Sequence, residues 1–414
     1  MNKIKIMDVL SGKNVWEYYQ EYKKSQWYSE SDLKQIKINK FKKLVEHCYL
    51  NVPYYRKFMN KVGIVPSDVV DLSIIENFPI VTKEIIKSNY KEFIPSNLNT
   101  IKGVKVAQTG GTTGNILLKR NDAKSRGAVW GAFRRFEDWM NYKPGDKALI
   151  LMGGHVIKHK NLVYLKSMLK KKMVDLINNQ ISFNPYETSS EDIENIIYAL
   201  KKYNFKLIRG YSQYLYNLSK LLQNRGLHFN IPSITTTAEP LLQIHRDIFK
   251  KVFGAESFDQ YGCGEVGGIA FECEKHEGLH ITEEHVIIEI NENNEMIVTD
   301  LDNFAMPFIR YWNADQILLS DKECSCGRKH KLIKKVLGRV CDYIIGINGE
   351  YLHWAYFWHL VFDSGISEKY DLRKFQIVQK NREAIVFRYV AKKLSMEDER
   401  KLTDNIRYRL GDIK

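Results

Sequence analysis

Short apolar runs alternate with longer amphipathic segments over residues 145–262, and this alternation constrains the fold more than any other feature of the sequence. The apolar runs are KALILMGG, NFKLIRGY and PSITTTAEP. Helical spacing of apolar residues follows these runs around 161–171, in SQYLYNLSKLLQNRG and in LLQIHRDIFKKVFG. The second of these helices is expected to have a serine cap and a glycine stop. Strands separated by helices of this length predict parallel crossover units, and therefore an α/β fold. Ligands of such sheets gather beyond the carboxyl ends of the strands, where TTTAEP and YGCGE occur.

The flanking segments carry other signals. Residues 1–100 are predicted to be mostly helical, with Thr82 capping one helix. GVKVAQ and ILLKR are predicted strands that flank a Gly/Thr loop. An apolar stripe predicts a long helix after Asp122, and HVIIEINENNEMIVTDL predicts an antiparallel hairpin. We therefore expect mixed sheets flanked by helices in a large domain, residues 1–337, and a small α+β domain, residues 338–414.

The composition excludes several classes of protein. The 414 residues are 44% hydrophobic and 12% aromatic, as in an ordinary globular protein. The net charge of +14 comes from lysines spread along the chain, so we expect LKKKMVD and LIKKVLGR to be solvated. No clustered basic helix supports a nucleic-acid binder, whereas acidic ligands such as nucleotides suit this charge. The sequence shows no signal peptide and no membrane span of ~20 apolar residues, and its six cysteines do not form a disulfide framework. These features predict a cytoplasmic protein.

The Gly/Thr loop, TGGTTG at residues 109–114, has two explanations. It is not a Walker loop, because no Lys-Ser/Thr pair follows Gly114 and a strand rather than a helix comes next. The loop is either a plain turn or a segment whose backbone amides and threonine hydroxyls wrap phosphate oxygens. The loop alone does not decide between them.

Five short stretches occur in a fixed order: QTGGTTGN, TTTAEPL, YGCGE, TDLDNFAMPFIRYWNAD and LGRVCDY. Each is weak alone, but the set in this order and spacing resembles the adenylate-forming superfamily of acyl-CoA synthetases and their relatives. The closer resemblance is to the phenylacetate–CoA ligase and capsular-polysaccharide CapK-like branch. NVPYYRKFMNKVGI, FPIVTKEII and GYSQYLYNLSKLL are similar to connecting segments of that branch, so the resemblance covers residues 35–414.

The resemblance implies ATP-dependent activation of a carboxylic acid as an acyl-adenylate, followed by transfer to CoA or to a hydroxyl or amine acceptor. It implies that Glu265 holds Mg²⁺ beside the α-phosphate and that Glu265 and Thr113 are catalytic, although Glu265 alone could be a surface carboxylate. The implied nucleotide site has three parts. The phosphate loop is Thr109, Gly110, Gly111, Thr112, Thr113 and Gly114; the adenine slot is Ala238, Glu239 and Pro240 opposite Tyr261 and Gly262; Asp315 binds ribose, and Arg339 ribose or phosphate. Asp315 alone could cap a turn.

The same resemblance gives a loose position for the acid. The acyl pocket is expected near Tyr211, Ser212, Gly267 and Ile269, where no residue demands a particular small carboxylic acid. A role in cell-surface polysaccharide synthesis follows from the branch alone. A homodimer is left open by the sequence.

A second constellation has the composition of a metal site. Cys273 and His280 occur in CEKHEGLH, and Cys324 and Cys326 in CSCGR. Four thiolate or imidazole ligands match a closed tetrahedral zinc site, and some members of the ligase branch resemble this chain at these positions. Free buried thiols are the alternative, and His276 is a competing ligand. Cys48, Cys263 and Cys341 are expected to be small buried residues.

Three departures from the family pattern bear on activity. RYWNAD replaces a motif closer to RYRTGD, and Cys341 stands where an aspartate is common at the hinge. The chain stops at RYRLGDIK, and Lys414 does not match the glycine–lysine segment of relatives, so we expect the catalytic tail to be missing or the adenylation step lost. A catalytically impaired nucleotide-binding relative is therefore the alternative to an active ligase.

Overall fold

The computed structural model describes residue 8 and residues 14–108, 117–153, 162–185, 190–339, 343–347, 351–353, 366–370, 372 and 374–410. Contacts divide the chain into two compact units. The first comprises Met1–Asn313 and Ile317–Leu337, and the second comprises Ala314–Gln316 and Gly338–Lys414.

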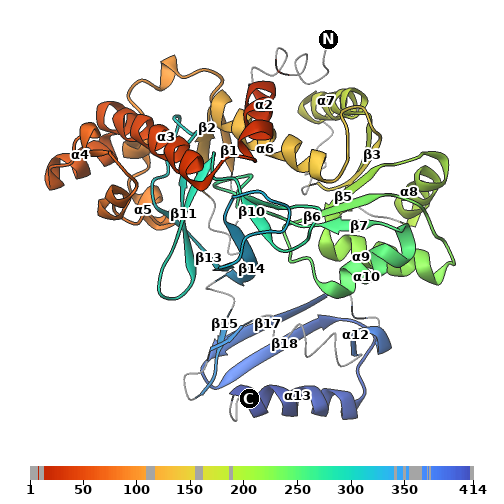
Figure 1. The fold of residues 1–414 in the computed structure, drawn as a ribbon. Helices are drawn as coiled ribbons and strands as arrows, with labels where there is room; N and C mark the ends of the chain where they lie inside the picture. Colours follow the sequence, from red (N-terminus) through yellow and green to blue (C-terminus); the bar gives the residue numbers. More distant parts are fainter. Residues whose placement is uncertain are drawn as a thin grey trace. The chain divides into compact units, whose positions relative to one another are not determined.

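A five-stranded parallel sheet forms one half of the first unit (Figure 1), with the strand order β4–β3–β5–β6–β7. Its strands are β3 (Ala148–Leu151), β4 (Gln180–Phe183), β5 (Leu207–Tyr211), β6 (Ser233–Thr237) and β7 (Glu256–Phe258). The connecting helices are α7 (Leu162–Asn178), α8 (Ser190–Lys202), α9 (Ser212–Asn224) and α10 (Gln243–Phe253). The predicted crossover units are thereby confirmed, although α7 continues beyond the predicted end at residue 171.

The two faces of this sheet bury alternate residues of each strand. Leu149, Ile208 and Ile234 face a core that α8, α9 and α10 complete. Ala148 and Leu207, each one residue earlier, belong to a different core built around α6 (Ala123–Trp139). This alternation follows from the period of two in a strand, so residues on the α6 side of the sheet can be assigned from their register.

Helix α6 also contacts the second sheet. Phe136 packs against Phe258 of the parallel sheet and Phe271 of the other sheet, with ring centroids 6.4 and 4.9 Å away. The helix begins where the sequence predicts, and Asp122 caps it, because its Oδ1 accepts a hydrogen bond from the Ser125 amide at 2.8 Å. Helix α2 (Val15–Ser25) packs on α6, and a Cβ at Gly131 would lie 2.6 Å from the Tyr18 Cβ. A glycine is therefore needed at that crossing.

The second sheet has seven strands in the order β11–β12–β13–β14–β10–β9–β8. They are β8 (Gln260–Tyr261), β9 (Ala270–Glu272), β10 (Leu279–Ile281), β11 (Val286–Ile290), β12 (Glu295–Asp300), β13 (Tyr311–Leu319) and β14 (Leu332–Arg339). The β11–β12 hairpin has the predicted antiparallel pairing, with Val286 opposite Asp300. A separate hairpin joins β1 (Lys105–Gln108) and β2 (Leu118–Asn121), so the two strands predicted around the Gly/Thr loop are confirmed.

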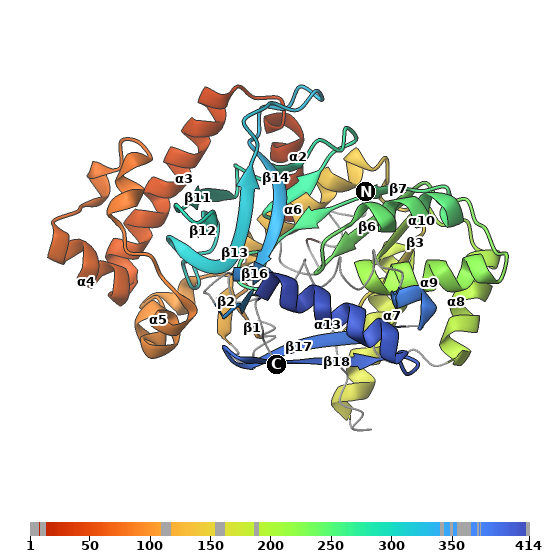
Figure 2. The same cartoon turned by 90° about the horizontal axis from the view of Figure 1, so that it is seen from below.

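Helices from the amino-terminal region share a core with the seven-stranded sheet (Figure 2). They are α3 (Glu30–Asn51), α4 (Pro53–Val62) and α5 (Lys83–Ser88), with 3-10 turns at Pro66–Asp68, Ser73–Asn77, Tyr90–Phe93 and Leu98–Thr100. Thr82 caps α5 as predicted, since its hydroxyl accepts from the Ile85 amide at 3.3 Å. No helix formed by the described residues is long and apolar enough to cross a membrane.

The second unit has its own small core. Its hairpins are β15 (Tyr343–Ile345) with β16 (Tyr351–His353) and β17 (Lys374–Asn381) with β18 (Ala384–Val390), and its helices are α12 (Ile366–Lys369) and α13 (Met396–Leu410). Leu402 and Ile406 of α13 pack against Phe375 and Phe387 of the longer hairpin. The mixed sheets of the large part of the chain and this α+β unit match the fold class predicted from the sequence.

Candidate active site

Glu265 of YGCGE lies in a buried, positively charged environment. It is 7% exposed, and its Oε1 lies 3.6 Å from the Nζ of Lys83 at the start of α5. The Nζ of Lys119 on β2 donates to the Glu265 backbone oxygen at 3.0 Å. Burial lowers the pKa of Lys119, because desolvation disfavours its ammonium form. Glu265 is therefore not an ordinary surface carboxylate.

The YGCGE segment contacts the start of β13. Burial and the nearby Glu265 carboxylate, which accepts a hydrogen bond from Tyr311, raise the pKa of Tyr311, so its hydroxyl remains protonated. Two residues further along β13, the Asn313 amide donates to the Tyr261 hydroxyl at 3.1 Å. An added Cβ on Gly262 would lie 3.1 Å from the Gly268 amide nitrogen, so the glycine keeps this turn tight. These contacts unite two of the five sequence motifs.

The TTTAEP motif ends β6 beside α9. Ala238 has φ +70°, a left-handed backbone conformation that costs energy for a residue with a Cβ, and Pro240 follows at the same bend. The Glu239 carboxylate accepts a hydrogen bond from the Gln213 amide at 2.8 Å, and the Ser212 hydroxyl donates to the Glu239 backbone oxygen at 3.0 Å. Burial raises the pKa of Glu239, which the Gln213 amide opposes.

These contacts correct one prediction about α9. Ser212 does not cap the helix, because it is the first helical residue and Tyr211 precedes it without a capping hydrogen bond. The Glu239 carboxylate occupies that role from a neighbouring loop, and a negative charge there is favoured by the helix dipole. The predicted glycine stop is confirmed, since Gly226 follows the helix with φ +66°.

The predicted ribose residues form an ion pair. Asp315 is 8% exposed, and its Oδ1 lies 3.4 Å from the Arg339 Nε. Asp315 lies inside β13. The preceding Ala314 has φ +63°, a second strained alanine beside a predicted nucleotide residue.

The phosphate loop lies outside the described residues. This applies to Thr109, Gly110, Gly111, Thr112, Thr113 and Gly114, and also to Cys341 and Lys414. The strands on either side of the loop bring its ends together, because Gln108 pairs with Leu118. Lys119, the residue after Leu118, contacts the Glu265 backbone oxygen, so strand β2 of this hairpin lies beside the YGCGE segment.

A cavity of ≈ 330 Å³ lies between α6, α7 and the parallel sheet. Its wall includes the apolar side chains of Trp130, Phe133, Ile150 and Met152. Thr237 and Gln260 also line it, next to Ala238 and Tyr261 in the chain. The cavity therefore reaches the carboxyl end of β6, where ligands of parallel sheets bind.

The four predicted pocket residues lie outside the lining of this cavity. Ile269 is fully buried in the core of the seven-stranded sheet, and the Gly267 backbone oxygen lies 3.2 Å from the His285 Nε2. Tyr211 donates its hydroxyl to the Gly153 oxygen at 2.8 Å, while Ser212 contacts Glu239. Sequence reasoning instead missed Lys83, Lys119, Tyr311 and Arg209. Only tertiary contacts distinguish each of these residues from its neighbours in the chain.

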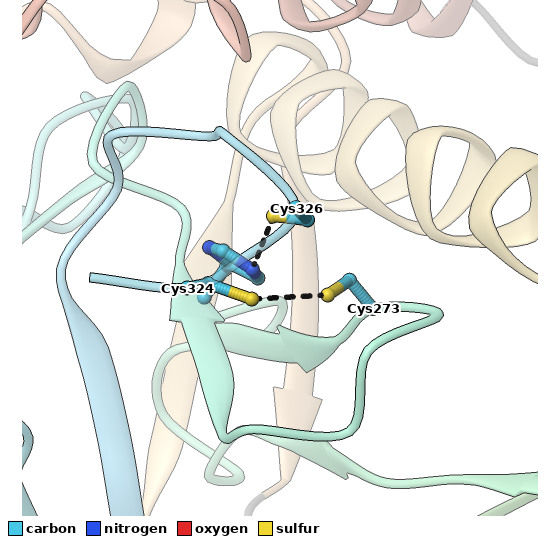
Figure 3. Close-up of side chains that lie close together, drawn as sticks. Cys273, Cys324 and Cys326 are labelled. Atoms are coloured by element: carbon cyan, nitrogen blue, oxygen red, sulfur yellow. Dashed lines mark hydrogen bonds between the residues drawn. The ribbon is translucent and has the colours of Figure 1, made fainter. Parts of the chain in front are cut away.

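Cys273, His280, Cys324 and Cys326 form one cluster, and Figure 3 shows how its three cysteines lie. Their candidate ligand atoms all lie within 4.8 Å of one another. The Cys273 and Cys324 Sγ atoms are 3.6 Å apart, and the Cys326 Sγ lies 3.4 Å from the His280 Nε2. A tetrahedral zinc with Zn–S of ~2.3 Å and Zn–N of ~2.0 Å requires separations of about 3.8 and about 3.5 Å. The donor set therefore fits zinc, and the sulfur separation is too long for a disulfide.

Burial disfavours the charged forms of Cys273, Cys324 and His280 when no cation binds. Desolvation raises the pKa of the Cys324 thiol to about 11, and that of Cys273 also rises. Desolvation, with nearby His330 and Arg328, lowers the pKa of His280 to about 3, so its imidazole is in the neutral form that a metal requires. His276 lies 3.3 Å from Glu272 and is not part of the cluster.

The comparisons with known proteins agree with this architecture. No family model matches the chain. The phenylacetate–coenzyme A ligase of Thermus thermophilus is 24% identical over 352 residues, which cover 76% of this chain and 73% of that protein. The Escherichia coli K12 enzyme of the same name is 24% identical over 346 residues, covering 77% and 74%. The structure of 2-hydroxyisobutyryl-CoA ligase in the postadenylation state has a TM-score of 0.71 and 15% identity, covering 93% of this chain and 85% of that one.

Fold and sequence together support the class of adenylate-forming ligases for this protein. Its sequence is similar to phenylacetate–CoA ligases, and its fold is similar to that of a CoA ligase of known structure.

Proposed function

We propose that the chain uses ATP and Mg²⁺ to convert a small carboxylic acid into its acyl-adenylate, and then transfers the acyl group to CoA. The observation that carries the proposal is the convergence of Glu265 with Lys83, Lys119 and Tyr311 at the end of the hairpin that bears the Gly/Thr loop. Nothing in the described contacts bears on polysaccharide synthesis, so the proposal ends at acyl transfer.

The chemistry explains why such a set of residues is useful. A carboxylate that attacks the α-phosphorus must approach another anion, so the reaction needs positive charge and fixed orientation rather than an acid–base pair. Mg²⁺, when held by Glu265, would neutralise part of the phosphate charge. Lys83 lies 3.6 Å from Glu265 and holds the carboxylate in place. Asp315 would bind the ribose and Arg339 the ribose or phosphate, and Ala238, Glu239 and Pro240 would form the adenine slot with Tyr261.

The direct test is acid-dependent exchange of pyrophosphate into ATP. We expect exchange with Mg²⁺ and at least one acid from a panel of aryl, fatty and hydroxy acids, and thioester formation when CoA is added. AMP binding, followed by calorimetry, serves as the parallel measurement. Exchange without thioester would restrict the proposal to adenylation, and AMP binding without exchange for any acid would contradict it.

We further propose that Cys273, His280, Cys324 and Cys326 hold a structural zinc ion. All four donors are used by such a site, which leaves no open position for catalysis. The ion would link β9, β10 and the loop before β14, and zinc at a thousandfold excess over its dissociation constant stabilises a protein by about 4 kcal/mol.

The Cys324→Ser variant is expected to lose bound zinc and to unfold at a lower temperature. Elemental analysis should give one zinc per chain for the unmodified protein and much less for the variant. Since the thiols must lose protons to bind the ion, zinc uptake should release protons and weaken as the pH falls. Cys48→Ala is the control, because Cys48 is buried away from the cluster. Equal zinc contents in all three proteins would contradict the assignment.

A further inference from the structure

Two arginines and one glutamate line the otherwise largely apolar cavity beside α6. The Arg209 Nη2 on β5 lies 3.1 Å from the Glu137 Oε1, and Arg134 pairs with the Glu137 Oε2. Their side chains are 13%, 19% and 7% exposed, for Arg209, Arg134 and Glu137. Charged groups are costly to hold in such a place, so an unbalanced set suggests a bound partner.

The set is unbalanced both in charge and in hydrogen bonds. Among the residues that line the cavity, two guanidinium groups face one carboxylate, and the second carboxylate near Arg134, that of Asp138, lies outside the lining. Each guanidinium offers five N–H donors and no acceptor, while Glu137 already accepts from both arginines. The Arg209 Nε is buried and has no hydrogen-bond partner among the described residues. A ligand that supplies an acceptor, above all an anionic one, would correct both imbalances.

The position of Arg209 in the sheet indicates how long such a ligand is expected to be. Arg209 pairs in register with Thr235, two residues before Thr237 at the end of β6. At ~3.3 Å per residue, the Cα of Arg209 lies about 7 Å deeper along the sheet than that of Thr237, and this backbone offset sets the scale of the ligand. Trp130, Phe133 and Met152 line the cavity as well, and the Arg209 guanidinium lies 5.5 Å from the centre of the Phe133 ring.

We propose that this cavity selects acids carrying a second anionic or hydrogen-bond-accepting group about 7 Å from the carboxyl group that is activated, with Arg209 as the residue that recognises it. The inference rests on the proposed function, because the reacting carboxylate is taken to lie at the Thr237 end of the cavity. An apolar body between the two polar ends would contact Trp130 and Phe133. Aromatic or straight-chain acids with a terminal carboxylate have this form.

The test compares matched acids in ATP–pyrophosphate exchange. The acids are 1,4-phenylenediacetate against 4-ethylphenylacetate, and adipate against hexanoate, each pair differing at the remote end. We expect at least a tenfold higher kcat/KM for the member with the second carboxylate. In Arg209→Met this preference should fall at least tenfold, and Arg209→Lys should restore part of it. Arg225→Met is the control, because Arg225 forms an exposed ion pair with Glu194 on the other side of the sheet.

The outcomes separate this inference from the proposed function. Exchange that favours the apolar acids, or a preference unchanged in Arg209→Met, would overturn the inference and leave adenylation intact. No exchange with any acid, together with retained AMP binding, would overturn the proposed function and this inference with it. Far-ultraviolet circular dichroism and thermal unfolding of each variant establish that a lost preference does not come from unfolding.

Discussion

Replacing Glu265 with glutamine is expected to reduce acid-dependent ATP–pyrophosphate exchange by about 10²–10³-fold, the effect typical of removing one group that stabilises charge in a transition state. The glutamine has nearly the same size but cannot neutralise a divalent cation. Since Lys83 and Tyr311 contact the carboxylate, its loss also leaves the Lys83 ammonium without its partner at 3.6 Å. The measurement is the exchange rate at several Mg²⁺ concentrations. The Mg²⁺ concentration that gives half of the maximal rate should be higher for the variant than for the unmodified protein.

A matched control distinguishes a local effect from a general one. Glu256→Gln removes an exposed glutamate whose side chain is 57% accessible and pairs with Lys250, and this variant should retain its exchange rate. AMP binding to Glu265→Gln should change much less than the rate, because the ribose and adenine contacts lie elsewhere. A variant that exchanges pyrophosphate as fast as the unmodified protein would show that Glu265 has no role in adenylation.

Local patterns were sufficient to predict most elements of the fold. The β11–β12 hairpin follows from alternating apolar residues, and the parallel units follow from alternating strand and helix periods. A helix end was predictable where the cap is local, as with Thr82. The cap of α9 was not, because Glu239 comes from a loop 26 residues beyond the Gln213 amide.

The candidate site shows the same limit. Ordered motifs predicted roles for Glu265, Tyr261 and Asp315, and the cysteine motifs predicted a cluster whose ligand atoms the tertiary structure brings within 4.8 Å of one another. Lys119 has no such signal, since it contacts a residue 146 positions away. Arg209 occurs in an apolar run typical of a strand, and only the register of the sheet shows that it faces α6 and the cavity. Pocket residues were therefore the least predictable part of the site.

Arg135→Met is expected to destabilise the protein by about 3–5 kcal/mol, the usual cost of leaving one member of a buried ion pair without its partner. The Arg135 and Glu284 side chains are both 0% exposed, and the Arg135 Nη1 lies 2.8 Å from the Glu284 Oε1. This pair joins α6 to the segment after β10, and the Arg135 guanidinium lies against the Tyr22 and Trp139 rings. Chemical unfolding in zinc-containing buffer would measure the change, and Arg225→Met, which breaks an exposed pair, should cost under about 1 kcal/mol.

The pH dependence identifies the cause of that loss. Burial raises the pKa of Glu284, but Arg135 and His330 outweigh burial and hold this pKa below its ordinary value of 4.5. In the unmodified protein, Glu284 therefore stabilises the fold at pH values above 4.5, and this stabilisation is lost as the pH falls. Without Arg135, burial dominates and the folded-state pKa rises, so the carboxylate destabilises the variant increasingly as the pH rises above 4.5. Both effects make the variant less stable than the unmodified protein at high pH. The difference in unfolding free energy between the two proteins should therefore be larger at pH 8 than at pH 5. A difference independent of pH would instead assign the loss to packing of the arginine between the aromatic rings.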